Sequence, residues 1–378
     1  MDIDHQNKES LKVVHIISSL ERGGAQGILM KLVIHSDKKK YSHYIISLKS
    51  GNAYQDIIVE NQLEDCIFIV DKKRVLRSLT GLFSFIKEIK PDILHSWMYH
   101  ADLFTSLLKP FFGSVNIIWS FHHASPMHNK WLSYSIAKIC SYLSYFVPNK
   151  IISCSDLAKK EHIAFGYDEK KIQTINNGVD SREFVFSEKN IKDYSQEKLL
   201  TIGFIGRYHP IKGYDVFIKS AEIISKKYPD LRFIMIGSNM DRNNINLIEM
   251  LRRHNLEKVT KLYGEEVKDI RKYYNMMDIY ICTSYSESFS LTLVESAFLG
   301  IPSISTDVGI AKDIISESNL VVRIGDNIGI VNSIISVLKF SKKQSEDMLK
   351  ANFDKAFKTF TLDRMIEEYQ YLYDNNSH

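Results

Sequence analysis

The sequence predicts an α/β protein of two domains, each built on a parallel β-sheet with helices on both faces. A chain of 378 residues is long enough for about two ordinary domains. Short apolar runs alternate with helical patterns over most of its length, and this alternation is typical of parallel sheets. The apolar pattern lapses once, in the polar segment 181–198, and therefore divides the chain into two arrays.

The first array begins with an apolar run and continues as strands separated by helical patterns. Its helices include those expected at residues 75–89 and 155–165. We expect its strands at residues 13–17, 44–48, 67–70, 93–96, 116–121 and 150–153.

The second array repeats this organisation. A helix at about 290–299 is expected to end at Gly300, with Pro302 just beyond it. A last helix should lie near residues 364–373. We expect strands at residues 199–205, 231–236, 259–262, 279–282 and 303–305. The predicted organisation is an N-terminal domain at 1–180, a linker at 181–198, a C-terminal domain at 199–360 and a terminal helical segment at 361–378.

Composition and charge exclude several classes of protein. The formal net charge is only +4 and no nucleic-acid motif accompanies it, so we expect no nucleic-acid partner. Four distant cysteines without pairing or metal spacing suit a reducing cytoplasm. The polar N-terminus is unlike a signal peptide. The run at 131–149 is too short and polar for a transmembrane helix, and we expect a mostly buried helix there, with a membrane-surface helix as the alternative.

Basic residues cluster in the first array, at residues 38–40 and 72–77 and at Lys87 and Lys90. Such clusters are usually solvated faces. The alternative is contact with an anionic membrane surface, which attracts basic clusters.

Two glutamates eight positions apart are the most informative pair in the chain. Glu295 lies in an otherwise apolar predicted helix, where a carboxylate is costly unless it is hydrogen-bonded, for example to a sugar diol. Glu287 lies in the preceding loop, where the N-terminus of the helix offers free N–H groups to an anion. This combination suits a nucleotide-sugar. The alternative is that Glu287 favours the helix dipole and Glu295 is a surface acid.

A second group of candidates lies between Gly206 and Gly213. The strand is expected to end at Gly206, so that Arg207 projects beyond the sheet, and Lys212 opens the next helix. Two cations at a strand end and a helix start can clamp a pyrophosphate. The alternative is that both are ordinary surface residues.

The first array contributes glycines and histidines at expected strand ends. Gly23 and Gly24 follow the first strand, and the absence of G-x-G-x-x-G there argues against a dehydrogenase. His122 ends another strand, where a structural role is the alternative to a catalytic one. We expect the strand-flanking segment with His95, Tyr99 and His100 to line an acceptor pocket, and the histidines lack the spaced acidic partner of a metal site.

The Glu-x7-Glu spacing, with Ser-Phe after the first Glu and Gly-Ile-Pro after the helix, resembles the retaining GT-B glycosyltransferases of family 4. The Gly-Gly loop, the hinge sequence Asn177-Gly178-Val179-Asp180 and the Arg207 segment fit the same family in the right order. In the hinge, Asn176 takes the position where the family has Pro.

This resemblance implies a GT-B fold of two Rossmann-like domains, whose last helix crosses back to the first domain. It implies that Glu295 holds the ribose, Glu287 the sugar hydroxyls, and His122 lies near the donor sugar. Catalytic roles would fall to Arg207, Lys212, Glu287 and His122, and donor contacts to Gly23, Gly24, Gly206, Arg207, Lys212, Gly237, Ser288, Phe289, Ser290 and Glu295.

The implied reaction is retaining and metal-independent, with no cofactor. The expected donor is a UDP-sugar carrying a hexose or N-acetylhexosamine, and the expected acceptor is a lipid-linked glycan in polysaccharide biosynthesis. We expect a cytoplasmic location, with peripheral contact to the inner face of the cytoplasmic membrane. A nucleotide-sugar epimerase of the same fold and a noncatalytic nucleotide-sugar-binding subunit are the alternatives.

Overall fold

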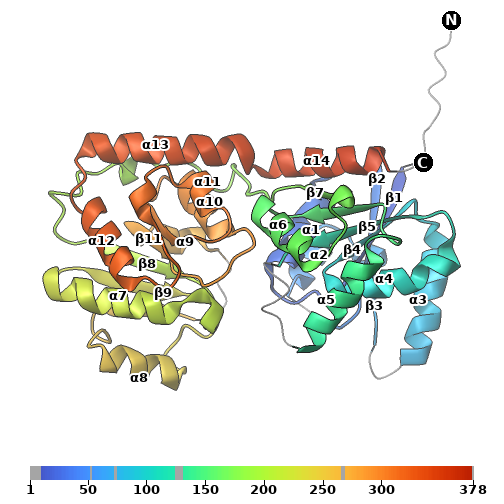
Figure 1. Ribbon diagram of the computed structural model, residues 1–378, viewed down its shortest axis with the longest axis horizontal. Helices are drawn as coiled ribbons and strands as arrows, with labels where there is room; N and C mark the ends of the chain where they lie inside the picture. The colour runs from blue at the N-terminus through green and yellow to red at the C-terminus, as the bar shows by residue number, and fades with distance from the viewer. Residues whose placement is uncertain (1–9, 52, 72–74, 124–130, 265–268, 377–378) are drawn as a thin grey trace, which may run out of the picture. The chain divides into compact units, whose positions relative to one another are not determined.

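A computed structural model describes residues 10–51, 53–71, 75–123, 131–264 and 269–376. The chain forms two compact units (Figure 1). Unit 1 comprises Met1–Asn177 and Leu362–His378, and unit 2 comprises Gly178–Thr361. Each unit is built on one parallel sheet, as the sequence predicts.

Unit 1 contains a seven-stranded sheet in the order β3-β2-β1-β4-β5-β6-β7. Its strands are β1 (Leu11–Ile17), β2 (Tyr41–Ser47), β3 (Ile67–Ile69), β4 (Ile93–Trp97), β5 (Asn116–Phe121), β6 (Lys150–Ser153) and β7 (Ile172–Thr174). Its helices are α1 (Gly24–His35), α2 (Gln55–Glu60), α3 (Val75–Ile89), α4 (Tyr99–Phe112), α5 (Trp131–Leu143), α6 (Asp156–Phe165) and α14 (Leu362–Asp374).

Unit 2 contains a six-stranded sheet in the order β10-β9-β8-β11-β12-β13. Its strands are β8 (Thr201–Ile205), β9 (Arg232–Ile236), β10 (Thr260–Tyr263), β11 (Ile279–Cys282), β12 (Ser303–Thr306) and β13 (Val321–Val322). Its helices are α7 (Tyr214–Lys227), α8 (Ile245–Arg253), α9 (Arg271–Tyr274), α10 (Leu291–Phe298), α11 (Ala311–Ile314), α12 (Asn327–Val337) and α13 (Lys342–Thr359).

Each sheet has a point at which the chain reverses its direction of winding. In unit 1 this point lies between β1 and β4, and in unit 2 between β8 and β11. Loops that leave neighbouring strands on opposite faces open a crevice at the carboxyl ends of those strands, and ligands of open α/β sheets bind there. The topology therefore predicts a site beyond β8 and β11.

The central strands are buried on both faces because helices cover both sides of each sheet. Residues of β11 are all buried, as are those of β4 and β12. This is the reason that these strands read as continuous apolar or small runs rather than as alternating patterns.

The segment 181–198 differs from the linker that the sequence predicts, because it belongs to unit 2. The Tyr194 hydroxyl donates to the carbonyl oxygen of Asp278 at 3.1 Å, and Lys192 forms an ion pair with the carboxylate of the same residue. Asn190 donates to the carbonyl oxygen of Leu299 at 2.8 Å. Long-range contacts of this kind leave no signal in local composition. The chain passes between the units at Asn177–Gly178 and Thr361–Leu362 instead.

Candidate active site

The candidate site of unit 2 is built from the loops that follow β8 and β11. After β8 the chain makes a single 3₁₀ turn at Pro210–Lys212 and enters α7 through Gly213. Gly213 has a φ of +67°, and a Cβ there would lie 1.9 Å from the carbonyl oxygen of Thr283. The hydroxyl of Thr283 donates to the carbonyl oxygen of Gly213 at 2.8 Å. Only glycine allows the two loops to approach this closely.

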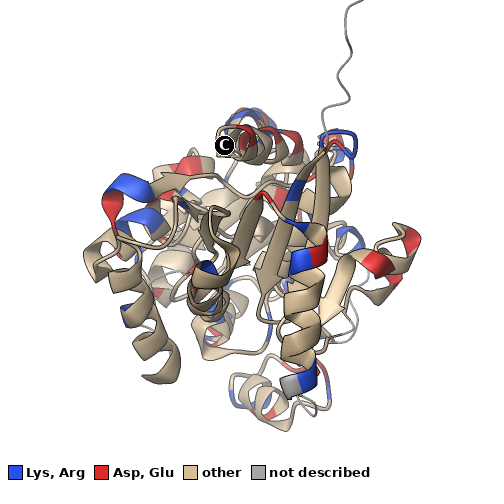
Figure 2. Ribbon diagram, turned by 90° about the vertical axis from the view of Figure 1, so that its right-hand side faces the viewer, with Lys and Arg blue, Asp and Glu red and all other residues tan. Residues whose placement is uncertain are grey.

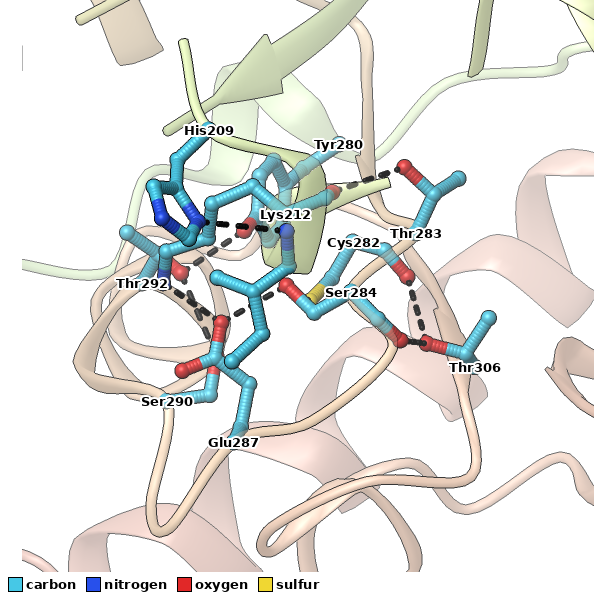
Figure 3. A network of polar contacts seen from close by, with 11 residues as sticks. His209, Lys212, Tyr280, Cys282, Thr283, Ser284, Glu287, Ser290, Thr292 and Thr306 are labelled. Atoms are coloured by element: carbon cyan, nitrogen blue, oxygen red, sulfur yellow. Dashed lines mark hydrogen bonds and ion pairs between the residues drawn. The ribbon is translucent and has the colours of Figure 1, made fainter. Parts of the chain in front are cut away.

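Lys212 and Glu287, which the sequence places 75 residues apart, form an ion pair of 2.6 Å between Nζ and Oε1 (Figure 3). The Ser284 hydroxyl donates to the same oxygen at 2.7 Å. Only 14% of the Glu287 side chain and 27% of the Lys212 side chain are exposed. Both donors bond to Oε1, which leaves Oε2 for a ligand hydroxyl.

Glu295 lies on α10 and is held by a buried phenol. The Tyr274 hydroxyl lies 2.8 Å from Glu295 Oε2 and 3.1 Å from the carbonyl oxygen of Thr292. Tyr274 is fully buried, so its hydroxyl holds one carboxylate oxygen of Glu295 in a fixed position. The expected cost of a carboxylate in an apolar helix is thus partly offset by a hydrogen bond within the fold.

The N-terminus of α10 has an unusual backbone. Ser290, the residue that precedes the helix, has a φ of +77°, a conformation that costs energy for a residue other than glycine. Phe289 is buried and its ring packs against Phe360 at a centroid distance of 5.4 Å. Gly309 closes this loop, because a Cβ there would lie 2.7 Å from the carbonyl oxygen of Phe289. The free N–H groups of α10 follow directly after the Glu287 loop.

The ends of β8 and β9 complete the site. The amide of Tyr208 donates to the carbonyl oxygen of Ser238 at 2.8 Å, and a Cβ on Gly237 would lie 2.3 Å from the carbonyl oxygen of Gly206. Arg207 is exposed here, and among the described residues its side chain has no hydrogen-bond or ion-pair partner. An exposed guanidinium at the end of this strand is suited to binding an anion.

Comparisons with known proteins identify the family of this chain. A family model described as Glycosyltransferase Family 4 matches residues 22–183, and one described as Glycosyl transferases group 1 matches residues 186–354. The two matches follow one another in the sequence and together span most of the chain. The chain belongs to the GT-B glycosyltransferases of family 4.

Relatives of this glycosyltransferase are distant in sequence. The O-antigen biosynthesis glycosyltransferase WclY of Escherichia coli is 22% identical and covers 97% of this chain and 98% of its own length. The capsular polysaccharide biosynthesis glycosyltransferase CapM of Staphylococcus aureus is 24% identical over 66% of this chain and 68% of its own length. The structure of Anabaena HepE in complex with UDP-glucose has a TM-score of 0.80 at 18% identity, covering 97% of this chain and 100% of HepE.

In unit 1 of the glycosyltransferase, Gly23 and Gly24 lie at the start of α1, just after β1. No atom lies within 4 Å of a Cβ built on Gly24, so the backbone there is open to a ligand. Neither glycine has a positive φ, so both allow close approach rather than a special turn.

His122 lies at the end of β5 and stacks on Trp97, with ring centroids 4.9 Å apart. Burial, assisted by repulsion from His123, lowers the pKa of His122 to about 3. Its imidazole is therefore neutral near pH 7. A neutral ring can still donate or accept a hydrogen bond at a donor sugar, and that role stays a prediction.

Two of the three residues predicted to line an acceptor pocket have other partners. His95 is fully buried, and its ring nitrogens lie 2.8 Å from the Tyr373 hydroxyl and 2.6 Å from the Ser120 hydroxyl. Tyr99 is also buried, with its hydroxyl 2.7 Å from Nε2 of His162. Both therefore stabilise the interior of unit 1. His100 is exposed on the first turn of α4 and remains a candidate for acceptor contact.

Sequence reasoning missed the supporting residues Ser284, Tyr274 and Gly309. The Ser-x-x-Glu spacing of Ser284 was visible in the sequence, whereas Tyr274 and Gly309 are brought to the site by long-range packing. The described residues include no group of three or more His, Cys, Asp or Glu side chains arranged to hold a metal ion.

Proposed function

We propose that this glycosyltransferase moves a hexose or N-acetylhexosamine from a UDP-sugar to a lipid-linked glycan, with retention of the anomeric configuration. The product would belong to a bacterial surface polysaccharide of the O-antigen or capsule type. In this proposal the reaction uses no metal ion or other cofactor, and it takes place in the cytoplasm at the inner face of the cytoplasmic membrane.

The observation that carries the proposal is the contact between Lys212, Glu287 and Ser284 at the carboxyl ends of β8 and β11. Arg207, an exposed second cation, follows β8 in the same loop as Lys212. A carboxylate that accepts from sugar hydroxyls beside cations that bind phosphates matches the two halves of a nucleotide-sugar. A site for an apolar ligand would need neither the carboxylate nor the cations.

The proposed chemistry applies to these positions the retention that the family resemblance implies. The bond between the anomeric carbon and the leaving β-phosphate oxygen breaks while the acceptor hydroxyl bonds to the same face of the sugar. The leaving phosphate takes the proton of the acceptor. Arg207 and Lys212 offset the negative charge that develops on the diphosphate, which is the work that a metal ion does in other transferases. Glu287 orients the sugar, and Glu295 holds the ribose.

The names of relatives support the donor and acceptor classes. WclY and CapM are described as O-antigen and capsular polysaccharide glycosyltransferases, and HepE was crystallised with UDP-glucose. We extend those classes to this chain on the strength of its site residues.

The test is a panel of nucleotide-sugars incubated with the protein and lipid-linked glycan acceptors. Nucleotide release and glycan product are measured separately, and the anomeric configuration of the product is determined by NMR. We expect release and product in equal amounts, with the donor's configuration retained. Epimerised sugar without transfer would indicate the epimerase, binding without either would indicate the noncatalytic subunit, and an inverted product would refute retention.

An Arg207→Ala variant tests the assigned site in the same assay. We expect turnover to fall by about 10²–10³, as on loss of one preorganised donor to developing charge. Arg253→Ala, which removes an exposed arginine on α8, is the matched control and should leave turnover unchanged. Similar rates for the two variants would mean that the cationic site is wrongly placed.

A further inference from the structure

Helix α5 of unit 1 and the turn that follows it expose several large apolar side chains. The sequence favours a buried α5, yet Trp131 is 81% exposed, Tyr142 68% and Phe146, just beyond the helix, 65%. Spacings of eleven and four residues keep these three on one side of the helix. We define the α5 apolar face by these residues and the exposed apolar side chains of the same segment, namely Trp131, Leu132, Tyr134, Ile139, Tyr142, Tyr145 and Phe146.

Two lysines brace the aromatic end of this face. Lys109 Nζ donates to the carbonyl oxygens of Phe146 and Val147 at 2.9 and 2.8 Å. Lys171 Nζ donates to those of Ser144 and Tyr145 at 3.0 and 2.9 Å. The turn is thus tied to α4 and to the segment before β7, so its exposed aromatic rings project from an ordered backbone. Positive charge lies directly behind them.

Charge and composition distinguish between the occupants that such a face could take. The sequence has no Asp or Glu from residue 103 to residue 155, although it contains Lys109, Lys130, Lys138 and Lys150 there. A symmetric dimer through this face would bring the lysines of this segment near their own copies, and the segment itself contains no acid to pair with them. An anionic lipid surface complements the lysines, and Trp and Tyr are the residues enriched at the level of lipid headgroups.

We infer that the α5 apolar face docks on a lipid bilayer, with its aromatic tips among the headgroups and the upper acyl chains. The inference rests on the proposed function only in that a lipid-linked acceptor is met at such a surface. No helix among the described residues is long and apolar enough to cross a membrane, so the contact is interfacial. The apolar face, rather than the basic clusters of residues 38–90, provides most of the binding.

Trp131 offers a direct readout. The other two tryptophans, Trp97 and Trp119, are fully buried, so a change in fluorescence on adding vesicles reports on Trp131. With vesicles of phosphatidylcholine and phosphatidylglycerol, we expect a blue shift of the emission and quenching by brominated acyl chains. Binding should persist at about 1 M salt, where the Debye length is only about 3 Å, because burial of apolar surface is not screened.

A triple variant, Ile139→Ser, Tyr142→Ser and Phe146→Ser, keeps the Trp131 reporter. We expect vesicle partitioning to weaken at least about tenfold, because three large side chains no longer leave water. The control triple variant changes Tyr371, Ile245 and Ile328 to Ser. These side chains are 73%, 71% and 53% exposed and lie elsewhere, so partitioning should not change. Thermal unfolding of both variants checks that the fold is intact.

Three outcomes would overturn the inference. Binding that disappears with salt and survives the triple variant would assign the contact to the basic clusters. A dimer that dissociates in the triple variant, seen by sedimentation velocity without vesicle binding, would assign the face to a second copy. A protein that stays monomeric and does not bind vesicles would show that the face does not dock on lipid. Nucleotide-sugar binding, measured by calorimetry without vesicles, tests the proposed function separately.

Discussion

At the scale of the residue, the two glutamates differ in what already holds them. Glu287 is paired with a cation and a hydroxyl in a loop, and Glu295 is paired with a buried phenol on a helix. The loop carboxylate lies beside the cations expected to bind the diphosphate, whereas the helical one is fixed relative to the sheet. We therefore propose that Glu287 holds the variable sugar and Glu295 the constant ribose.

Replacing each glutamate separately should reveal this division. Glu295→Gln should weaken the binding of UDP and of the intact donor alike. Glu287→Gln should leave UDP binding nearly unchanged while transfer falls, because a hydrogen bond from a sugar hydroxyl to a charged group contributes about 1.5–3 kcal/mol. Calorimetric binding of UDP, beside turnover, measures both. Equal losses of UDP affinity in the two variants would refute the assignment.

Tyr274 should act on ligand binding through Glu295. Tyr274→Phe removes the hydroxyl that holds Glu295 Oε2, so we expect UDP affinity to fall while 3′-deoxy-UDP affinity changes less. Tyr280→Phe is the matched control, because Tyr280 is equally buried and bonds to the Thr292 hydroxyl at 2.7 Å rather than to Glu295. A general loss of stability would affect both nucleotides and both variants in the same way.

At the scale of the element, helix α14 packs against three buried, neighbouring histidines, His15, His43 and His95. Trp97 Nε1 donates to Nδ1 of His15 at 3.2 Å, so His15 carries its proton on Nε2, 2.9 Å from Nδ1 of His43. On the same sheet face, His95 bonds to Tyr373 of α14, and the Tyr41 hydroxyl bonds to Asp374 at 2.7 Å. The contacts of His15 and His43 require neutral imidazoles, because Nδ1 of each ring accepts a hydrogen bond.

These three histidines predict a dependence of stability on pH. Burial lowers the pKa of His43 to about 4, and burial with repulsion from the neighbouring rings lowers the pKa of His15 and His95 well below the usual range. Below about pH 6.5 these histidines therefore bind more protons in the unfolded chain than in the folded chain. The free energy of unfolding should be largest above about pH 6.5 and fall as the pH drops toward 4.

The measurement is denaturant unfolding of wild type and His43→Gln between pH 7 and pH 4. Carboxylates titrate in both proteins and cancel in the difference. The variant should lose less stability on acidification than the wild type does. Parallel pH profiles would show that His43 is not responsible.

At the scale of the whole molecule, two parallel sheets place their ligand-facing loops at topological switch points. At the unit 2 switch point the positive charge comes from the side chains of Arg207 and Lys212. Lys and Arg positions elsewhere are interspersed with Asp and Glu on the face shown in Figure 2 rather than gathered in one patch.

Transfer should therefore survive excess chelator. We expect the rate in EDTA to equal the rate in untreated enzyme, because the leaving diphosphate is neutralised by side chains. The control is a metal-dependent glycosyltransferase assayed in the same buffer. Loss of activity that Mg²⁺ or Mn²⁺ restores would contradict the assigned role of Arg207 and Lys212.

The sequence by itself determined the fold class, most strands and the pair of glutamates. The strands β5, β6 and β11 and the helix α3 lie at the expected bounds, because buried parallel strands and amphipathic helices have strong local patterns. Gly300 has the positive φ of a residue that follows a helix, as its position predicts.

Only the tertiary structure decided the partners of these residues. That Lys212 meets Glu287, that Tyr274 holds Glu295 and that His95 faces Tyr373 depends on contacts between residues distant in sequence. The same holds for segment 181–198, which is polar enough for a linker yet packs on unit 2, and for α5, whose apolar pattern predicts burial although one side is uncovered. Periodicity records that a side chain is apolar, whereas burial depends on whether another element covers it.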